Sequence, residues 1–359
     1  MFAAHLVTTT PIVWTEPDTW SGIVDGHSSI LFATLAGLSL GLTAPRTPAP
    51  NGPGNATSVS VQRKRLVVRA ILLWLLGVLL TVTDVPVHII LQTYGVLFLI
   101  GAAMLTLRPR TLFLIAATLA LVMPFVVGGI EEAWGGSATD DPDTVALLLS
   151  WHYPFPLWTA FLAAGLGAGK VLRESTDNAW WLLGGGSVLV VLGYGVIGPI
   201  GNRGADEGAS MLISQLQSEP HSSGLGEAIG SGGFALAVIG GCVLLCSTRL
   251  RHVLWPVRIV GAMPLTAYVT HIVVWEFWIL GEDNVDSGVE AMGGFLALDP
   301  FWPLALCVTG TCMLWAMFIG KGPLEWALGR VSVLVVPDRK VSLTQGSGAS
   351  ASSANSISR

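Results

Sequence analysis

The chain has 359 residues, of which 52% are hydrophobic and only 11% are charged. A soluble domain carries roughly 25% charged residues, so this composition excludes a soluble globular protein and predicts a polytopic membrane protein. Its four cysteines lie inside apolar segments, which excludes a secreted disulfide framework and a CxxC metal site. The lipid bilayer is therefore the expected partner, and no nucleic-acid partner is expected.

Apolar segments recur along the whole chain. A helix needs about 20 mostly apolar residues to cross the bilayer. Nine segments approach this length: 26–42, 66–83, 85–107, 111–129, 145–169, 179–200, 228–246, 259–280 and 300–320. We expect them to form an all-α helical bundle that makes one integral-membrane domain over residues 1–340. Pro154 and Pro156 predict a kink near the start of the fifth helix.

Three segments fall outside these spans. Residues 44–62 are rich in Pro, Gly and Asn and predict a flexible cytoplasmic loop, and residues 341–359 are rich in Ser, Gly and Ala and predict a disordered cytoplasmic tail. Residues 1–7 are apolar without the basic start of a signal peptide. They look like the outer end of a helix whose first half is missing, so we expect a tenth, N-terminal helix upstream of Met1.

The basic residues predict the orientation. With nine spans, 17 of the 18 Lys and Arg residues fall on one side, and Arg203 alone falls on the other. Basic residues favour cytoplasmic loops. We therefore expect a multi-pass protein of the cell membrane with its N-terminus outside and its C-terminus in the cytoplasm.

Ionisable and polar side chains within apolar segments are the candidate functional residues, because they are costly there. Asp25 and His27 lie at the start of the first segment. Asp84, His88 and Gln92 are spaced i, i+4 and i+8, which predicts one shared helix face. Tyr268 and His271 are i, i+3 neighbours half way along the eighth segment, and His5 lies in the short N-terminal piece.

A neutral histidine can act as a general base or carry an acyl group, and a nearby carboxylate fixes its tautomer. Such groups at the outer face suit acyl transfer to an extracytoplasmic acceptor, and they suit a proton-coupled transporter equally well. For Asp84, His88 and Gln92 a further alternative is a hydrogen-bond network that holds helices together. No metal site is expected.

Several short motifs resemble those of one protein family. They are MFAAH at 1–5, WSGI at 20–23, LFATLAGLSL at 31–40, ILQTYGV at 90–96, GAMPLTAYVTH at 261–271 and GPLEW at 322–326. Together they resemble the heparan-α-glucosaminide N-acetyltransferase family and its bacterial YeiB-like relatives. The sequence departs from that pattern where Thr93 replaces an arginine. It also departs near Pro17, where the family has a histidine.

The resemblance implies a membrane acyltransferase that takes an acetyl group from cytoplasmic acetyl-CoA and passes it to a glycan or small acceptor outside. It implies catalytic roles for His5 and His271, to which we add Asp84 and His88 as orienting or relaying groups. Gln92, Tyr268, Asp25 and His27 are the expected substrate-binding residues. A proton-coupled transporter and a catalytically inactive family member stay open as alternatives, as does a homo-oligomer.

Overall fold

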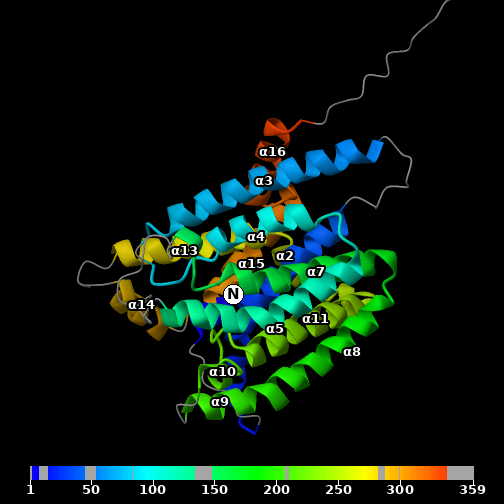
Figure 1. Ribbon diagram of the computed structural model, residues 1–359. Helices are drawn as coiled ribbons and strands as arrows, with labels where there is room; N and C mark the ends of the chain where they lie inside the picture. The colour runs from blue at the N-terminus through cyan, green and yellow to red at the C-terminus, as the bar shows by residue number, and fades with distance from the viewer. Residues whose placement is uncertain are drawn as a thin grey trace, which may run out of the picture.

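A computed structural model describes residues 2–7, 15–44, 54–83, 85–133, 148–206, 210–281, 288–298 and 300–337. The regular secondary structure of the described part of the chain is all helix, with no strand (Figure 1). In chain order, the helices are α1 (Phe2–Leu6), η1 (Pro17–Val24), α2 (His27–Thr43), α3 (Gly54–Leu80), α4 (Leu91–Met104), α5 (Pro109–Ala133), α7 (Phe155–Glu174), α8 (Asn178–Val190), η2 (Val191–Ile197), α9 (Gly198–Asp206), α10 (Met211–Ser214), α11 (Leu225–Cys246), η3 (Arg249–Arg251), α12 (Trp255–Gly261), α13 (Pro264–Gly281), α14 (Gly288–Ala297), α15 (Phe301–Phe318) and α16 (Pro323–Val335).

Each of the nine predicted apolar segments overlaps a helix, but their lengths differ. Among the described residues, five helices are long and apolar enough to cross a membrane: α5, α7, the run α8–η2–α9 (Asn178–Ala205), α11 and α15. The pair α12 and α13, bent by 80° at a short break, adds a sixth if it counts as one span, and α2 and α4 are shorter apolar helices. An all-helical, multi-pass membrane protein is thus confirmed, whereas the count of nine spans is not.

Three of the predicted boundaries differ from those in the structure. Residues 85–90, expected to begin a helix, are not helical, and α4 begins only at Leu91. Pro86 explains this, because its ring removes a backbone donor and disfavours helix in the preceding residue. Pro154 and Pro156 precede or open α7 and do not kink it. The expected loop 44–62 is helical from Gly54 onward, and the expected tail 341–359 lies outside the described residues.

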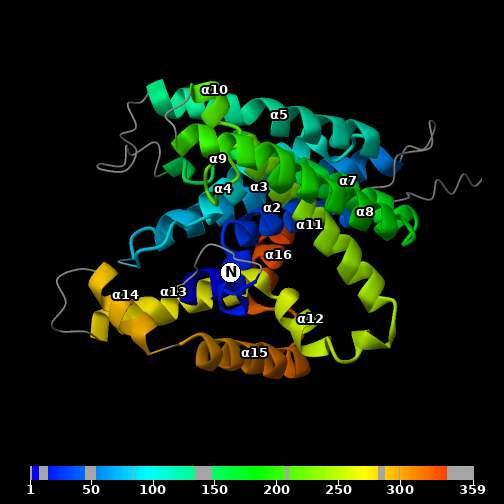
Figure 2. The same cartoon turned by 90° about the horizontal axis from the view of Figure 1, so that it is seen from below.

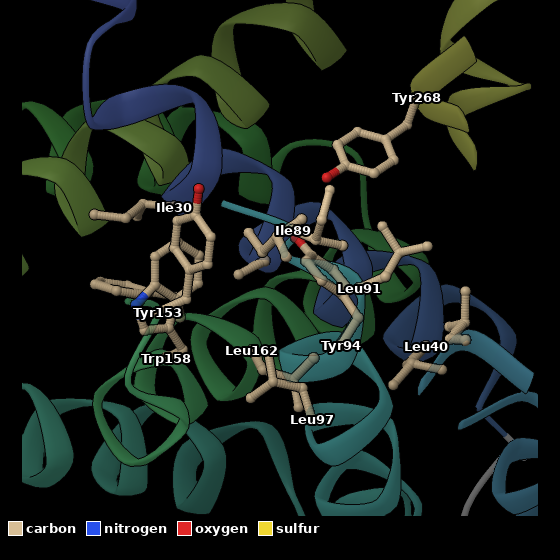
Figure 3. Close-up of a cluster of buried hydrophobic side chains, with 14 of the residues drawn as sticks. Ile30, Leu40, Ile89, Leu91, Tyr94, Leu97, Tyr153, Trp158, Leu162 and Tyr268 are labelled. Atoms are coloured by element: carbon tan, nitrogen blue, oxygen red, sulfur yellow. The ribbon is translucent and has the colours of Figure 1, made fainter. Parts of the chain in front are cut away.

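The centre of the bundle is the crossing of α2 with α7. Gly37 and Gly165 let the two backbones touch: a Cβ added at Gly37 would lie 2.0 Å from the carbonyl oxygen of Leu162, and one added at Gly165 would lie 1.9 Å from that of Thr34. In lipid, helices associate by such close van der Waals packing of small residues. Around this crossing lies an apolar core that includes Ile30, Leu97 and Leu162, and Tyr268 of α13 reaches toward it (Figure 3).

Helices α2, α4, α7 and α11 all begin near one end of the bundle, which we call the cavity end because a cavity described below opens there. The opposite end carries two basic side chains, buried Lys170 and half-buried Arg173. There Lys170 Nζ donates to the carbonyl oxygens of Leu105 and Leu107 at 2.7 and 2.6 Å, just beyond the end of α4. Arg173 donates to the carbonyl oxygen of Ala44 at the end of α2. Cations at helix C-termini satisfy free carbonyls and oppose the helix dipole, so we call this end the basic end.

The segment α12–α15 forms a separate side of the molecule. In Figure 2, α13, α14 and α15 lie away from α5 and α8, with the short α1 near α13 and α16 between α15 and the main bundle. Buried Met263 in the break after α12, Ala267 of α13 and Cys312 of α15 belong to a small core of their own, against which partly buried Ile259 and Val260 of α12 pack. This side therefore packs partly on itself and partly on the main bundle through α13.

We expect Gly165→Ala to destabilise the protein by about 1–3 kcal/mol, the usual cost of overpacking a tight contact. The new methyl group would have to push α2 away from α7. Gly185→Ala in α8 is the matched control, because nothing lies within 4 Å of a Cβ there, and its effect should stay within about 0.5 kcal/mol. Thermal loss of helical circular dichroism in detergent measures both, and equal melting temperatures would contradict the close crossing.

A histidine-lined cavity as the candidate functional site

A cavity of about 210 Å³ opens among the helix starts at the cavity end. Its wall is contributed by α1, η1, the start of α2 and the segments that precede α4, α7 and α11. The ionisable side chains that line it are His5, Asp25, His88, His152 and His221. Four of the seven histidines of the chain therefore face one space, although they come from four separate parts of the sequence.

Three of these imidazoles form a row. The rings of His88 and His152 stack with their centroids 3.7 Å apart and 15° between their planes, and His221 follows at 5.3 Å from His152. His221 Nε2 lies 3.5 Å from Asp25 Oδ1. Partial burial, reinforced by the neighbouring imidazoles, lowers the pKa of His88 and of His152 from the usual 6.5. His88 and His152 are therefore neutral at pH 7, and neutral imidazoles accept and pass protons.

A second imidazole pair lies where α1 meets α13. The ring centroids of His5 and His271 are 5.6 Å apart, and Trp275 packs against both rings. His5 lines the cavity, whereas His271 is fully buried behind it. His271 Nδ1 lies 3.4 Å from the carbonyl oxygen of Ala267, which can only accept. In the neutral ring Nδ1 therefore carries the proton, and Nε2 has the lone pair.

The expected face of Asp84, His88 and Gln92 does not form, because the helix begins after His88. His88 lines the cavity, and Gln92 is 1% exposed where α4 packs against Gly77 of α3. Asp84 lies outside the described residues. Its expected meeting with His5 and His271 stays a prediction.

The remaining predicted substrate-binding residues occupy different places. Asp25 lines the cavity. His27 does not, because its ring is held in a network: Nδ1 donates to the carbonyl oxygen of Asp25 at 2.8 Å, and Nε2 accepts from the Tyr194 hydroxyl at 2.9 Å. Tyr268 is 4% exposed and packs against His271. Substrate roles for Gln92, His27 and Tyr268 thus stay predictions, and all three side chains serve helix packing.

Glu227, in the first turn of α11, is a site residue that the sequence analysis missed. This carboxylate is 5% exposed and accepts from the backbone amides of His221 and Ser223, each at 2.8 Å, and from the Ser222 hydroxyl at 3.3 Å. Both His221 and Ser223 have positive φ angles, 63° and 53°, which are costly for residues with a side chain. Glu227 therefore holds a strained loop that presents His221 to the cavity.

Gly26 completes this arrangement on the other side of the loop. Its φ of +66° favours glycine, and a Cβ there would lie 3.1 Å from Pro220 and 3.3 Å from Glu227 Oε1. The signal for Glu227 was present in the sequence, since it is an ionisable residue at the start of an apolar helix.

Comparisons with protein-family models, with curated proteins and with solved structures find no match for this chain. Among the described residues, no group of three or more His, Cys, Asp or Glu side chains is arranged to hold a metal ion. The cavity wall offers four imidazoles, the Asp25 carboxylate and a space for a small molecule.

We expect Glu227→Ala to free the loop at 219–224, because the amides of His221 and Ser223 lose their acceptor. Their hydrogen exchange, measured by mass spectrometry in detergent, should speed up by about tenfold or more, which corresponds to the loss of hydrogen bonds to a charged acceptor. Glu219→Ala is the control, since that side chain is exposed in the same loop. Unchanged exchange in Glu227→Ala would show that the loop keeps its conformation without Glu227, which contradicts this role.

Proposed function

We propose that this protein is a membrane-embedded acyltransferase of the heparan-α-glucosaminide N-acetyltransferase-like group. It would move an acyl group, most simply acetyl, from cytoplasmic acyl-CoA to an extracytoplasmic glycan or small acceptor. The observation that carries the proposal is the contact of His5 with His271 at the wall of a cavity. Two neutral imidazoles beside a space for an acceptor are what a two-step acyl transfer needs.

In the first step, the lone pair of one imidazole attacks the thioester carbonyl carbon. The carbon–sulfur bond breaks, and CoA leaves as a thiolate that takes up a proton from cytoplasmic water, while the acylated imidazole keeps its own N–H proton. In the second step, an acceptor amine or hydroxyl in the cavity attacks the acyl-imidazole carbon, the bond to the imidazole nitrogen breaks, and the second imidazole takes the acceptor proton. The row from His88 to His221 then passes that proton toward Asp25.

The proposed orientation puts the cavity end outside and the basic end in the cytoplasm of a cell-membrane protein. Buried Lys170 and half-buried Arg173 support it, because cationic groups favour the cytoplasmic side. A positive inner face also attracts a polyanionic acyl-CoA.

A proton-coupled transporter is the second candidate, and one observation favours it. The break of 80° between α12 and α13 resembles the discontinuous helices that line transporter binding sites. A transporter would show pH-dependent uptake or efflux in proteoliposomes without consuming acyl-CoA.

We expect His5→Ala and His271→Ala each to lower transfer from labelled acetyl-CoA by purified protein by about 100-fold or more, the usual contribution of a positioned general base. His252→Ala, an exposed histidine beyond α11, is the control and should match the parent. If both site variants keep the activity of the parent, the assignment of these histidines is overturned. If the parent protein neither transfers nor hydrolyses acetyl-CoA, the acyltransferase proposal is overturned, and a transporter or an inactive family member remains.

The rate should also depend on pH in a defined direction. Because the pKa values of His88 and His152 are lowered from 6.5, their neutral forms persist below that pH. We expect kcat/KM to be flat between about pH 7.5 and about pH 6.5, roughly half a unit to either side of neutrality, and to fall only at lower pH. A midpoint at or above pH 6.5 would mean that these imidazoles do not carry the proton.

A further inference from the structure

Helices α12 and α13 together could make one membrane span that is interrupted between them. Such an interruption leaves the backbone N–H groups at the start of the second helix without partners inside that helix. Helix α12 ends at Gly261, and α13 starts at Pro264 and departs at 80°. The first amides of a helix have no partner within it, and in an apolar setting each must find an acceptor.

A carboxylate from a distant part of the chain supplies that acceptor. Glu325 of α16 accepts at Oε1 from the amides of Leu265 and Thr266, at 2.8 and 3.0 Å. Its Oε2 accepts from the Thr266 hydroxyl, which in turn accepts from the amide of Leu324 at 3.3 Å. A negative charge at a helix N-terminus is also favoured by the helix dipole. Four hydrogen bonds thus join the starts of α13 and α16.

Gly322 and Arg65 support the contact between α13 and α16. A Cβ at Gly322 would lie 2.1 Å from Glu325 Oε2 and 2.9 Å from Thr266 Oγ1, so only glycine allows the close approach. At the other end of α16, Arg65 Nε of α3 donates to the carbonyl oxygen of Val336 at 3.0 Å. Helix α16 therefore connects the start of α13 to the main bundle.

His271 lies five residues beyond Thr266, about 7.5 Å along the helix axis. Its ring packs on one side against Tyr268 and on the other against Trp275, all on the buried face of α13. The direction in which α13 leaves the break therefore fixes where His271 meets His5.

We propose that Glu325 is a positioning residue: by holding the start of α13 against α16, it sets His271 against His5. A catalytic role for the contact of His271 with His5 rests on the proposed function. The contact itself can be measured without an activity assay. A carboxylate that served only to stabilise the fold would leave the distance between residues 5 and 271 unchanged in variants that still fold.

The test uses the full chain with its four cysteines replaced by serine and with His5→Cys and His271→Cys introduced. A short bifunctional methanethiosulfonate reagent should join the pair, seen as the mass of the linker bridging the two peptides after digestion. Adding Glu325→Ala should lower the yield by about fivefold or more, since several hydrogen bonds to a charged acceptor are lost. Glu325→Gln, which keeps an acceptor for both amides, should restore most of it.

Glu174→Ala at the exposed end of α7 is the matched control and should leave the yield unchanged. If Glu325→Ala does not give monodisperse protein, Thr266→Val is used, which removes the hydroxyl alone and should lower the yield by about twofold. A yield equal to that of the parent in the folded variant overturns the proposal. Acetyl-CoA turnover by the parent is assayed separately, so failure of the proposed function is not confused with failure of this contact.

Discussion

The close crossing of α2 and α7 is the constraint on which the rest of the structure depends. Gly37, Gly41, Gly165 and Gly169 let the two backbones meet almost without side chains between them. Because α2 and α7 start at the same end, this contact brings the turn before α2 and the turn before α7 together. Asp25 and His152 come from those two turns, and the cavity forms between them.

The bundle then separates its polar groups into two ends. Helix starts collect at the cavity end, where Glu227 accepts the amides that the loop before α11 leaves free. Helix ends collect at the basic end, where Lys170 and Arg173 donate to free carbonyls. An apolar core lies between them, so groups that require water or a partner are satisfied near the two ends. Buried His271 lies on α13 against His5 of the cavity wall, and for that reason it is a candidate for chemistry.

The helical bundle could be predicted from the sequence, because apolar segments of sufficient length leave no alternative in a membrane. The site could be predicted only in part. His5, His88 and Asp25 were identified as polar groups in apolar surroundings, and they do line the cavity. The expected helical face of Asp84, His88 and Gln92 was wrong because Pro86 delays the helix. Glu227 and Glu325 were missed, because their partners are backbone amides, and which amides need an acceptor is known only once the loop before α11 and the break before α13 are placed in space.

The most direct test of transfer to an outside acceptor is a measurement of which side of the membrane the cavity faces. In the cysteine-free protein, Val87→Cys puts a thiol in the cavity wall, and His252→Cys puts one beyond the opposite end of α11. A membrane-impermeant maleimide applied to intact right-side-out vesicles should label the first and should reach the second only after permeabilisation. Labelling of His252→Cys alone in intact vesicles would place the histidines in the cytoplasm and contradict transfer to an acceptor outside.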